Sequence, residues 1–376
     1  MKLPPLRIGD LTAPIPIVQG GMGIGVSLSG LASAVANEGG IGTISGALLG
    51  YEEPDYDKHP LDASICALKK EIAKARAKSP KGILAVNFLV AMNHYEKIVK
   101  SVLDQGVDLI VSGAGLPMHL PALVEGFRTK IAPIVSSGRA AEVIARLWDR
   151  NYKRTPDMVV VEGPEAGGHL GFTEESLLKH TNSRLSDLVK EVIRTLNPFR
   201  EKYGRDIPVV AAGGIFTGED ICEQLESGAA GVQMSTRFVA TEECDAHINF
   251  KKAYIGAREE DIVIIKSPVG MPGRALNNRF IQRIREKAEE IRGCTACIRF
   301  CNPKTAPYCI SKALVRAVQG DTEGGLMFVG SNAFRVDGIT TVRELISRLI
   351  REAEACYRGI QEKTSQSVTA AAVQSV

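Results

Sequence analysis

The chain has 376 residues, of which 44% are hydrophobic and 24% charged, and its formal net charge is +3. This is the composition of an ordinary globular protein, and so small a net charge gives no surface built for nucleic acid or for an anionic membrane. The length allows one large domain with an insert, or two ordinary domains.

The first residues, MKLPPLRIGD, lack the apolar core of a secretion signal. The apolar tract 14–44 is interrupted by Gln19, Asn37, Glu38 and many glycines, which argues against a membrane span. Eight cysteines without a secretion signal predict reduced thiols and a cytoplasmic protein.

Short apolar runs then alternate with amphipathic segments. The predicted strands are 15–19, 41–44, 83–87, 108–112, 132–136, 158–162, 208–212 and 231–234. Their nearly continuous hydrophobicity is typical of strands buried on both faces. The predicted helices between them are 27–38, 62–78, 94–105, 119–127, 139–151, 183–203 and 218–227. Eight strands alternating with helices predict an α/β fold, a (β/α)8 TIM barrel, with a doubly wound open sheet as the competing fold.

The alternation stops near residue 237. We therefore expect a barrel over 1–237, an inserted and mostly helical second domain over 238–323 that carries a cysteine cluster, a return to the barrel with a final helix over 324–362, and a disordered tail over 363–376.

Glycines and polar residues gather where the predicted strands end, and in a TIM barrel that edge carries the active site. The need for a tight turn explains any single glycine loop. Because such loops recur at one edge, we favour a second interpretation, in which their backbone N–H groups approach a phosphorylated ligand. The candidate cofactor-binding residues are Gly21, Met22, Gly23, Asn87, Ser112, Ser136, Glu162, Gly167, Gly168, Ala212, Gly213, Gly214, Gln233, Met234, Ser235 and Thr236. Neither a G-x-G-x-x-G dinucleotide fingerprint nor a P-loop is present.

His169 follows the sixth predicted strand in VVVEGPEAGGHLGF (159–172). A single histidine is more often structural or merely exposed. Here it lies at the predicted mouth of the barrel, on a loop that lets a substrate approach, and an imidazole titrates near neutrality. We therefore predict that His169 is the catalytic acid or base.

Four cysteines are clustered in CTACIRFCNPKTAPYC: Cys294, Cys297, Cys301 and Cys309. Four thiolates suit zinc or an iron–sulfur cluster, although the spacing matches neither a ferredoxin nor a zinc ribbon. Buried unreactive thiols and a redox pair at Cys294 and Cys297 are the alternatives.

Taken together, the segments PIVQGGMG (16–23), VNF (86–88), GAGLP (113–117), EGPEAGGHLG (162–171), PVVAAGGI (208–215), GAAGVQMSTRFVATEEC (228–244) and GRALNNRF (273–280) resemble the nitronate monooxygenase family, which includes barrel-type FMN-dependent enoyl-ACP reductases. The resemblance runs from about residue 4 to residue 350.

The resemblance implies an FMN-dependent oxidoreductase that acts on a small-molecule substrate. It places residues 21–23 along one side of the flavin, Asn87 at the ring or the ribityl chain, and Gly168 with His169 at the reactive face. Gly213, Gly214, Ser235 and Thr236 would hold the phosphate.

Three functions stay open: oxidation of a nitronate or similar carbon acid with His169 as base, NAD(P)H-dependent reduction of an enoyl thioester or quinone, and flavin or metal binding for regulation without turnover. A homodimer is compatible with the sequence.

The chain departs from many relatives at Ser136–Ser137, where a basic residue is common, at Ser235, where glycine is frequent, and in the longer segment 172–206.

Overall fold

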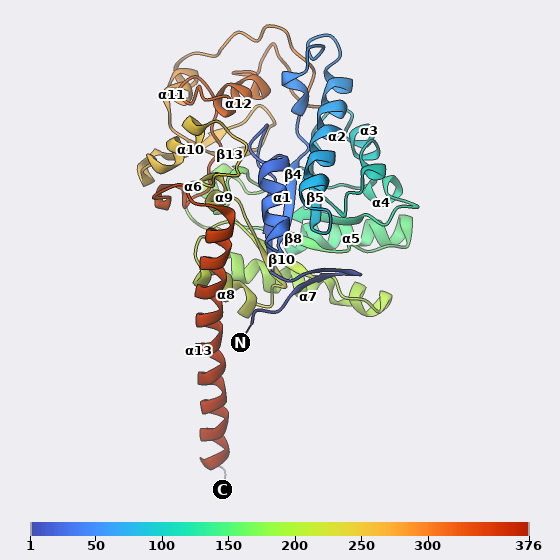
Figure 1. Ribbon diagram of the computed structural model, residues 1–376, viewed down its shortest axis with the longest axis vertical. Coiled ribbons are helices and arrows are strands. Elements are labelled where there is room, and N and C mark those ends of the chain that lie inside the picture. Colours follow the sequence, from blue (N-terminus) through green and yellow to red (C-terminus); the bar gives the residue numbers. More distant parts are fainter. Residues whose placement is uncertain (1, 375–376) are drawn as a thin grey trace.

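The computed structural model describes residues 2–374 (Figure 1). Eight parallel strands form a closed barrel in the order β10-β11-β3-β4-β5-β6-β7-β8. Their bounds are β3 (Ile17–Gln19), β4 (Ile41–Ser45), β5 (Ile83–Leu89), β6 (Leu109–Gly113), β7 (Lys130–Val135), β8 (Val159–Glu162), β10 (Val209–Ala212) and β11 (Gly231–Met234). The predicted TIM barrel is confirmed, and each predicted strand overlaps one strand of the barrel.

Helices cover the outside of the barrel, as the alternating pattern predicts. They are α1 (Ser29–Asn37), α2 (Pro60–Lys78), α3 (Tyr95–Lys100), α4 (Leu120–Leu123), α5 (Gly138–Tyr152), α7 (Leu185–Tyr203) and α8 (Gly218–Glu226), with 3-10 turns at Leu49–Glu52 and Leu103–Gln105. The short helix α6 (Glu174–Leu178), which was not predicted, packs instead against the strand Ile262–Lys266 of a later hairpin. Helix α8 begins with a capping box, because Thr217 accepts from the Asp220 N–H while Asp220 accepts from that of Thr217.

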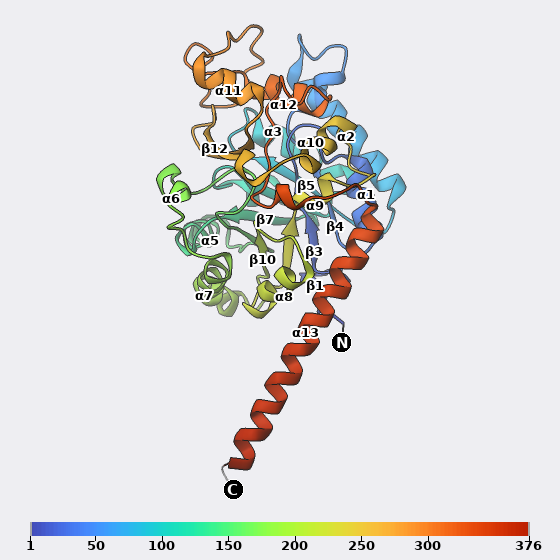
Figure 2. The ribbon, with the colours of Figure 1, turned by 90° about the vertical axis from the view of Figure 1, so that its left-hand side faces the viewer.

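The N-terminal hairpin of β1 (Leu6–Ile8) and β2 (Leu11–Ala13) lies across the end of the barrel where the strands begin (Figure 2). Leu6 and Ile8 are fully buried against apolar residues of the barrel interior, among them Val18 and Val160. The barrel is therefore closed at this end, and any opening lies at the opposite end, where the strands end.

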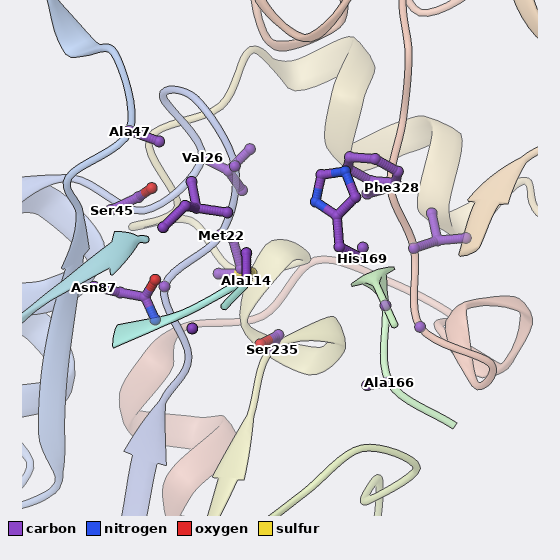
Figure 3. A pocket seen from close by; sticks show the side chains of 18 of the residues that line it. Met22, Val26, Ser45, Ala47, Asn87, Ala114, Ala166, His169, Ser235 and Phe328 are labelled. Carbon is purple, nitrogen blue, oxygen red and sulfur yellow. The ribbon is translucent and has the colours of Figure 1, made fainter. Parts of the chain in front are cut away.

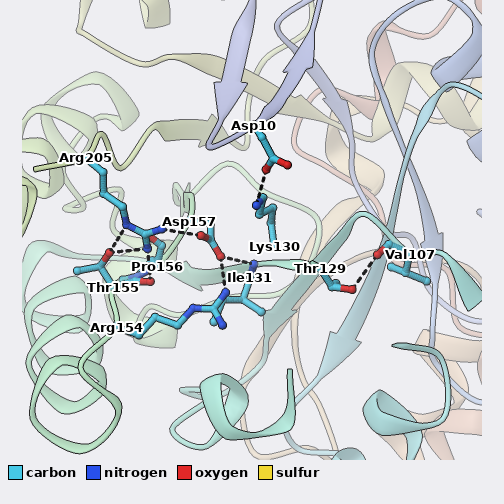
Figure 4. Close-up of polar contacts among 10 residues, drawn as sticks. All are labelled: Asp10, Val107, Thr129, Lys130, Ile131, Arg154, Thr155, Pro156, Asp157 and Arg205. Atoms are coloured by element: carbon cyan, nitrogen blue, oxygen red, sulfur yellow. Dashed lines mark hydrogen bonds and ion pairs between the residues drawn. The ribbon is translucent and has the colours of Figure 1, made fainter. Parts of the chain in front are cut away.

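A buried polar network also lies where strands begin (Figure 4). The Asp157 carboxylate accepts from the Ile131 N–H at 2.9 Å and forms ion pairs with Arg154 at 2.9 Å and Arg205 at 3.0 Å. Because Asp157 is buried, these partners offset the cost of removing its charge from water. The network therefore fixes how β7 joins the neighbouring strand β8.

Residues 238–323 cover the other end of the barrel. They contain α10 (Ile248–Ile255), a 3-10 turn (Glu259–Asp261), α11 (Arg279–Glu286) and α12 (Ile310–Val318), and α9 (Thr236–Val239) leads into them. The sequence predicted a mostly helical segment, but the structure adds a hairpin of β12 (Ile262–Lys266) and β13 (Pro272–Leu276) and a long loop. Asp245 joins this segment to the barrel, since its carboxylate accepts from the N–H groups of Leu28, Gly30 and Leu31 at the start of α1.

The chain returns to the barrel through residues 324–341, with a 3-10 turn at Ala333–Arg335, and ends in α13 (Val342–Gln374). The first part of α13 packs on α8, and the rest projects away from the body (Figures 1 and 2). Residues 363–374, whose composition predicts disorder, are helical here; alanine has the highest helix propensity, and extending a helix costs less than starting one. Residues 375 and 376 lie outside the described part.

Among the described residues, no helix combines the length and the apolar character needed to cross a membrane.

Candidate functional site

A pocket opens at the ends of the barrel strands (Figure 3), and residues of both the covering segment 238–323 and the returning segment 324–341 also line it. Residues at or just after the end of each of the eight barrel strands line it, from Gly21 after β3 to Ser235 after β11. Figure 3 shows Ser45 and Asn87 on one side and His169 with Phe328 on the other. The chemistry predicted at the strand ends therefore gathers in one cavity.

The pocket brings together most of the residues predicted from the sequence. It is lined by Gly21, Met22, Gly23, Asn87, Glu162, Gly167, Gly168, His169, Ala212, Gly213, Gly214, Gln233, Met234, Ser235 and Thr236.

Ser112 and Ser136 do not line the pocket. The Ser112 hydroxyl is fully buried and pairs with the Tyr95 hydroxyl of α3 at 2.8 Å, so it faces the helical layer outside the barrel. Neighbouring residues of a strand face opposite sides, and it is the next residue, Gly113, that reaches the pocket. Ser136 donates to the Gly171 carbonyl at 3.1 Å. Neither hydroxyl is placed to bind a ligand in this cavity.

Two glycines of the pocket cannot be replaced without a clash. Gly213 has φ +96°, and a Cβ there would lie 2.9 Å from the Ala166 nitrogen. A Cβ at Gly167 would lie 2.7 Å from the Gly330 nitrogen. Three loops that are distant in the sequence thus meet backbone to backbone at this wall, which leaves main-chain groups free of side chains beside the cavity.

Polar groups suited to a phosphate collect beside this wall. Ser235 and Thr236 contribute hydroxyls, and the Asn332 amide donates to the Gly214 carbonyl at 2.7 Å, which ties the returning segment to the loop after β10. The Ser331 Oγ is buried at the pocket and has no hydrogen-bond partner in the described part of the chain. A buried hydroxyl without a partner is costly, so it fits a site whose ligand supplies the missing partner.

His169 is held by the hairpin that the sequence did not predict. Gly168 and His169 form β9, which pairs antiparallel with β13, with Gly273 opposite His169 and Arg274 opposite Gly168. The Arg274 guanidinium also donates to the carbonyl of Pro164 at 2.8 Å. The loop that carries the imidazole is therefore fixed by backbone pairing and by a side chain from the covering segment.

The environment of the imidazole keeps it neutral. Nε2 lies 2.7 Å from the Ser267 hydroxyl, and the ring packs edge-on to Phe328 with centroids 4.9 Å apart. Burial lowers the pKa of His169 to about 4, because a low-dielectric surrounding disfavours the charged form. The surface that His169 retains faces the pocket. A neutral imidazole in that position has a free lone pair, which a base needs in order to take a proton from a bound carbon acid.

Glu162 at the end of β8 is the second titratable side chain deep in the pocket. Burial raises its pKa to about 7, with no neighbouring charge contributing. The carboxyl therefore carries a proton over part of the neutral range, and the protonated form is a hydrogen-bond donor.

Sequence reasoning missed Ser267, Phe328, Ser331 and Asn332. Ser267 lies between β12 and β13, and the other three lie in the returning segment 324–336. The one signal there is the step from the apolar run MFV to GSN at residues 327–332, which repeats the strand-to-glycine pattern of the barrel loops.

The four clustered cysteines lie in the covering segment, beside the pocket. All four are free thiols; Cys294 is exposed, and Cys297, Cys301 and Cys309 are half-buried. The described side chains contain no group of three or more His, Cys, Asp or Glu already arranged to hold a metal ion.

A closed parallel barrel with a glycine-lined pocket at the strand ends and a buried neutral histidine defines a class, the cofactor-dependent barrel enzymes. Comparison with known families narrows it. The nitronate monooxygenase family model matches residues 6–352, and the chain belongs to that family. The protein is therefore an enzyme, an FMN-dependent oxidoreductase.

Individual relatives agree with this assignment. A probable nitronate monooxygenase of Staphylococcus saprophyticus is 26% identical, over 77% of this chain and 83% of the relative. The structure of FabK from Thermotoga maritima superposes with a TM-score of 0.72 at 28% identity, covering 93% of this chain and 96% of that one. Nitroalkane oxidase from Streptomyces ansochromogenes gives 0.71 at 22% identity, covering 92% and 98%, and shares the fold.

Proposed function

We propose that the protein binds FMN in this pocket and oxidises a nitronate or a similar stabilised carbon acid, with His169 as the base. The observation that carries the proposal is the neutral imidazole, which faces a cavity that is also lined by a cradle of glycines and hydroxyls.

The residues present fit FMN. Gly213, Gly214, Ser235, Thr236 and the unpartnered Ser331 would hold the phosphate. Bound FMN would take two electrons from the substrate and pass them to dioxygen.

Asn87, with its amide group on the side of the pocket opposite His169, would contact the ring system or the ribityl chain (Figure 3). The substrate would then lie between the ring and the imidazole.

With a neutral nitro compound or another carbon acid as the substrate, His169 would remove the proton from the carbon that is oxidised, whereas a nitronate has already lost that proton. When Nε2–H donates to the Ser267 hydroxyl, Nδ1 keeps a free lone pair for that proton. Phe328 and the buried surroundings exclude water from the imidazole and so keep it in the basic, neutral form.

A reductase is the second candidate. The covering segment gives the pocket an apolar wall that includes Val269, Ile298, Leu314 and Phe328. Such a wall suits the acyl chain of an enoyl thioester, and NAD(P)H would then be the electron donor.

Anaerobic stopped-flow reduction of the bound flavin separates the two candidates. We expect an alkyl nitronate to bleach the flavin absorbance quickly and NAD(P)H to do so slowly or not at all. Fast bleaching by NAD(P)H alone would establish the reductase instead, and bleaching by neither would contradict both. The His169→Ala variant should keep its FMN and lose about 10²–10⁴-fold in the rate of bleaching by the carbon acid.

A further inference from the structure

The long loop in the covering segment is unusual for a compact protein. Residues 287–309 run from α11 to α12 without a helix or a strand, apart from one isolated bridge between Ile298 and Met92. Irregular loops of this length are uncommon in compact domains and usually have a function or bind a ligand that orders them. All four clustered cysteines lie in this loop.

The loop brings two of its four thiols to one side chain. The sulfurs of Cys297 and Cys309 contact the same atom, the Ser311 Oγ, at 3.0 Å and 3.7 Å. Cys294 lies three positions before Cys297 and Cys301 four positions after it, so one short loop carries all four thiols.

The backbone around the first two cysteines adopts a conformation that costs energy. Ala296 has φ +50°, a left-handed conformation that a non-glycine residue seldom adopts and that costs about 1–2 kcal/mol. In this conformation its N–H donates to the Cys294 sulfur at 3.4 Å. Asn93, after β5, anchors the turn by donating its backbone N–H to the Cys297 carbonyl at 3.0 Å. The strained turn is therefore held so that an N–H points at a cysteine sulfur.

We propose that Cys294, Cys297, Cys301 and Cys309 form one thiolate site for a single soft metal centre, either Zn²⁺ or an iron–sulfur cluster. Four cysteine thiolates are a complete ligand set for either centre. The exposed or half-buried state of these cysteines argues against inert filling of a hydrophobic core.

The charges near the loop favour such a centre. Residues 287–312 contain five Lys or Arg and two Asp or Glu. Four thiolates bring more negative charge than either centre neutralises, and the surrounding cations offset the excess. Because Ser311 holds two of the sulfurs, binding would replace these contacts with bonds to the metal and release the thiol protons.

The site would fix one wall of the pocket. Ile298 follows Cys297, Ile310 and Ser311 follow Cys309, and all three line the cavity. A metal centre would join both parts of this wall, which are otherwise connected by an irregular loop. The inference does not depend on the proposed function, because it concerns metal content alone.

Metal analysis of protein purified without oxygen tests the proposal. We expect either about one zinc per chain, or about four irons with matching acid-labile sulfide and a broad visible absorption beyond that of the flavin. The double variant Cys297→Ser, Cys309→Ser should lose the metal. The matched control Cys66→Ser, at an exposed cysteine of α2, should keep it.

A second measurement covers the case in which the double variant does not fold. In wild-type protein, alkylation followed by mass spectrometry should find the four cysteines protected until a chelator is added, with Cys66 reactive throughout. The proposal is overturned if the wild type binds neither metal after incubation with zinc chloride or with ferrous iron and sulfide. A Cys294–Cys297 disulfide in the anaerobic protein, or metal retained by the double variant, also overturns it.

Discussion

His169 Nε2 lies 2.7 Å from the Ser267 hydroxyl, although the two residues are 98 positions apart in the chain. Ser267 is buried, and its oxygen also accepts from the Val269 N–H at 3.3 Å. The hydroxyl therefore has a fixed position and holds the imidazole at the wall of the pocket.

The first prediction concerns this contact. Ser267→Ala should lower kcat about fivefold while FMN remains bound, because one hydrogen bond worth about 1 kcal/mol no longer orients the ring. Ser267→Thr keeps the hydroxyl and should recover most of the rate. The measurement is steady-state kinetics over a pH range, because the change should also move the pKa of the acid limb. If Ser267→Ala keeps wild-type kinetics and the pKa of the acid limb of its pH–rate profile is unchanged, Ser267 does not position the imidazole.

The second prediction concerns the pH dependence of activity. A base must be neutral to accept a proton, and burial lowers the pKa of His169 to about 4. The value of kcat/KM should therefore rise between about pH 3 and 5 and stay level through pH 6.5, the pKa of an exposed histidine. An acid limb centred at 6.5 would show that the imidazole is not desolvated in the working enzyme.

The third prediction concerns stability. His169 has a lowered pKa, so the unfolded chain binds more protons than the native state between about pH 4 and 6.5, and this contribution to the free energy of unfolding increases as pH rises. Glu162 has a pKa raised to about 7, so the native state binds more protons from its ordinary value of 4.5 upward, and its contribution falls as pH rises.

The two contributions oppose each other in the wild type. Urea unfolding at pH 5 and pH 7 should therefore show that Glu162→Gln gains more stability with rising pH than the wild type, and His169→Gln gains less. Identical pH dependence in all three proteins would contradict the burial of both groups.

The fourth prediction concerns the phosphate cradle. Ser331→Ala should weaken FMN binding about tenfold or more, since a hydrogen bond to a charged group contributes about 1.5–3 kcal/mol. Ser136→Ala is the matched control, because that hydroxyl lies outside the pocket. Fluorescence titration of the apoprotein gives both dissociation constants. If both variants bind FMN with equal affinity, Ser331 does not contact the bound FMN.

The fifth prediction concerns the closed end of the barrel. Asp157→Ala should lower the free energy of unfolding by about 3 kcal/mol, because it leaves Arg154 and Arg205 without their shared partner. Asp10→Ala removes a more exposed ion pair with Lys130 and should cost less than about 1 kcal/mol. Denaturant unfolding measures both, and equal losses would mean that burial of Asp157 does not matter.

The barrel could be predicted because its signals are local. A strand buried on both faces must be apolar along its length, so the runs that became β5 and β8 stand out from the amphipathic helices beside them. Glycines at the strand ends mark the site in the same way. Ser112 shows where this reasoning fails, since a shift of one residue along a strand turns a side chain from the pocket to the outer layer.

The sequence by itself determined the strands, the edge at which the pocket lies and the histidine found at that edge, since each depends on residues close together in the chain. Only the tertiary structure decided what holds that histidine and completes the cradle. Pairing of β9 with β13 and close packing of Gly330 against Thr236 join segments that are far apart in the chain. Periodicity records which face of a segment is buried, but not against which distant partner it packs.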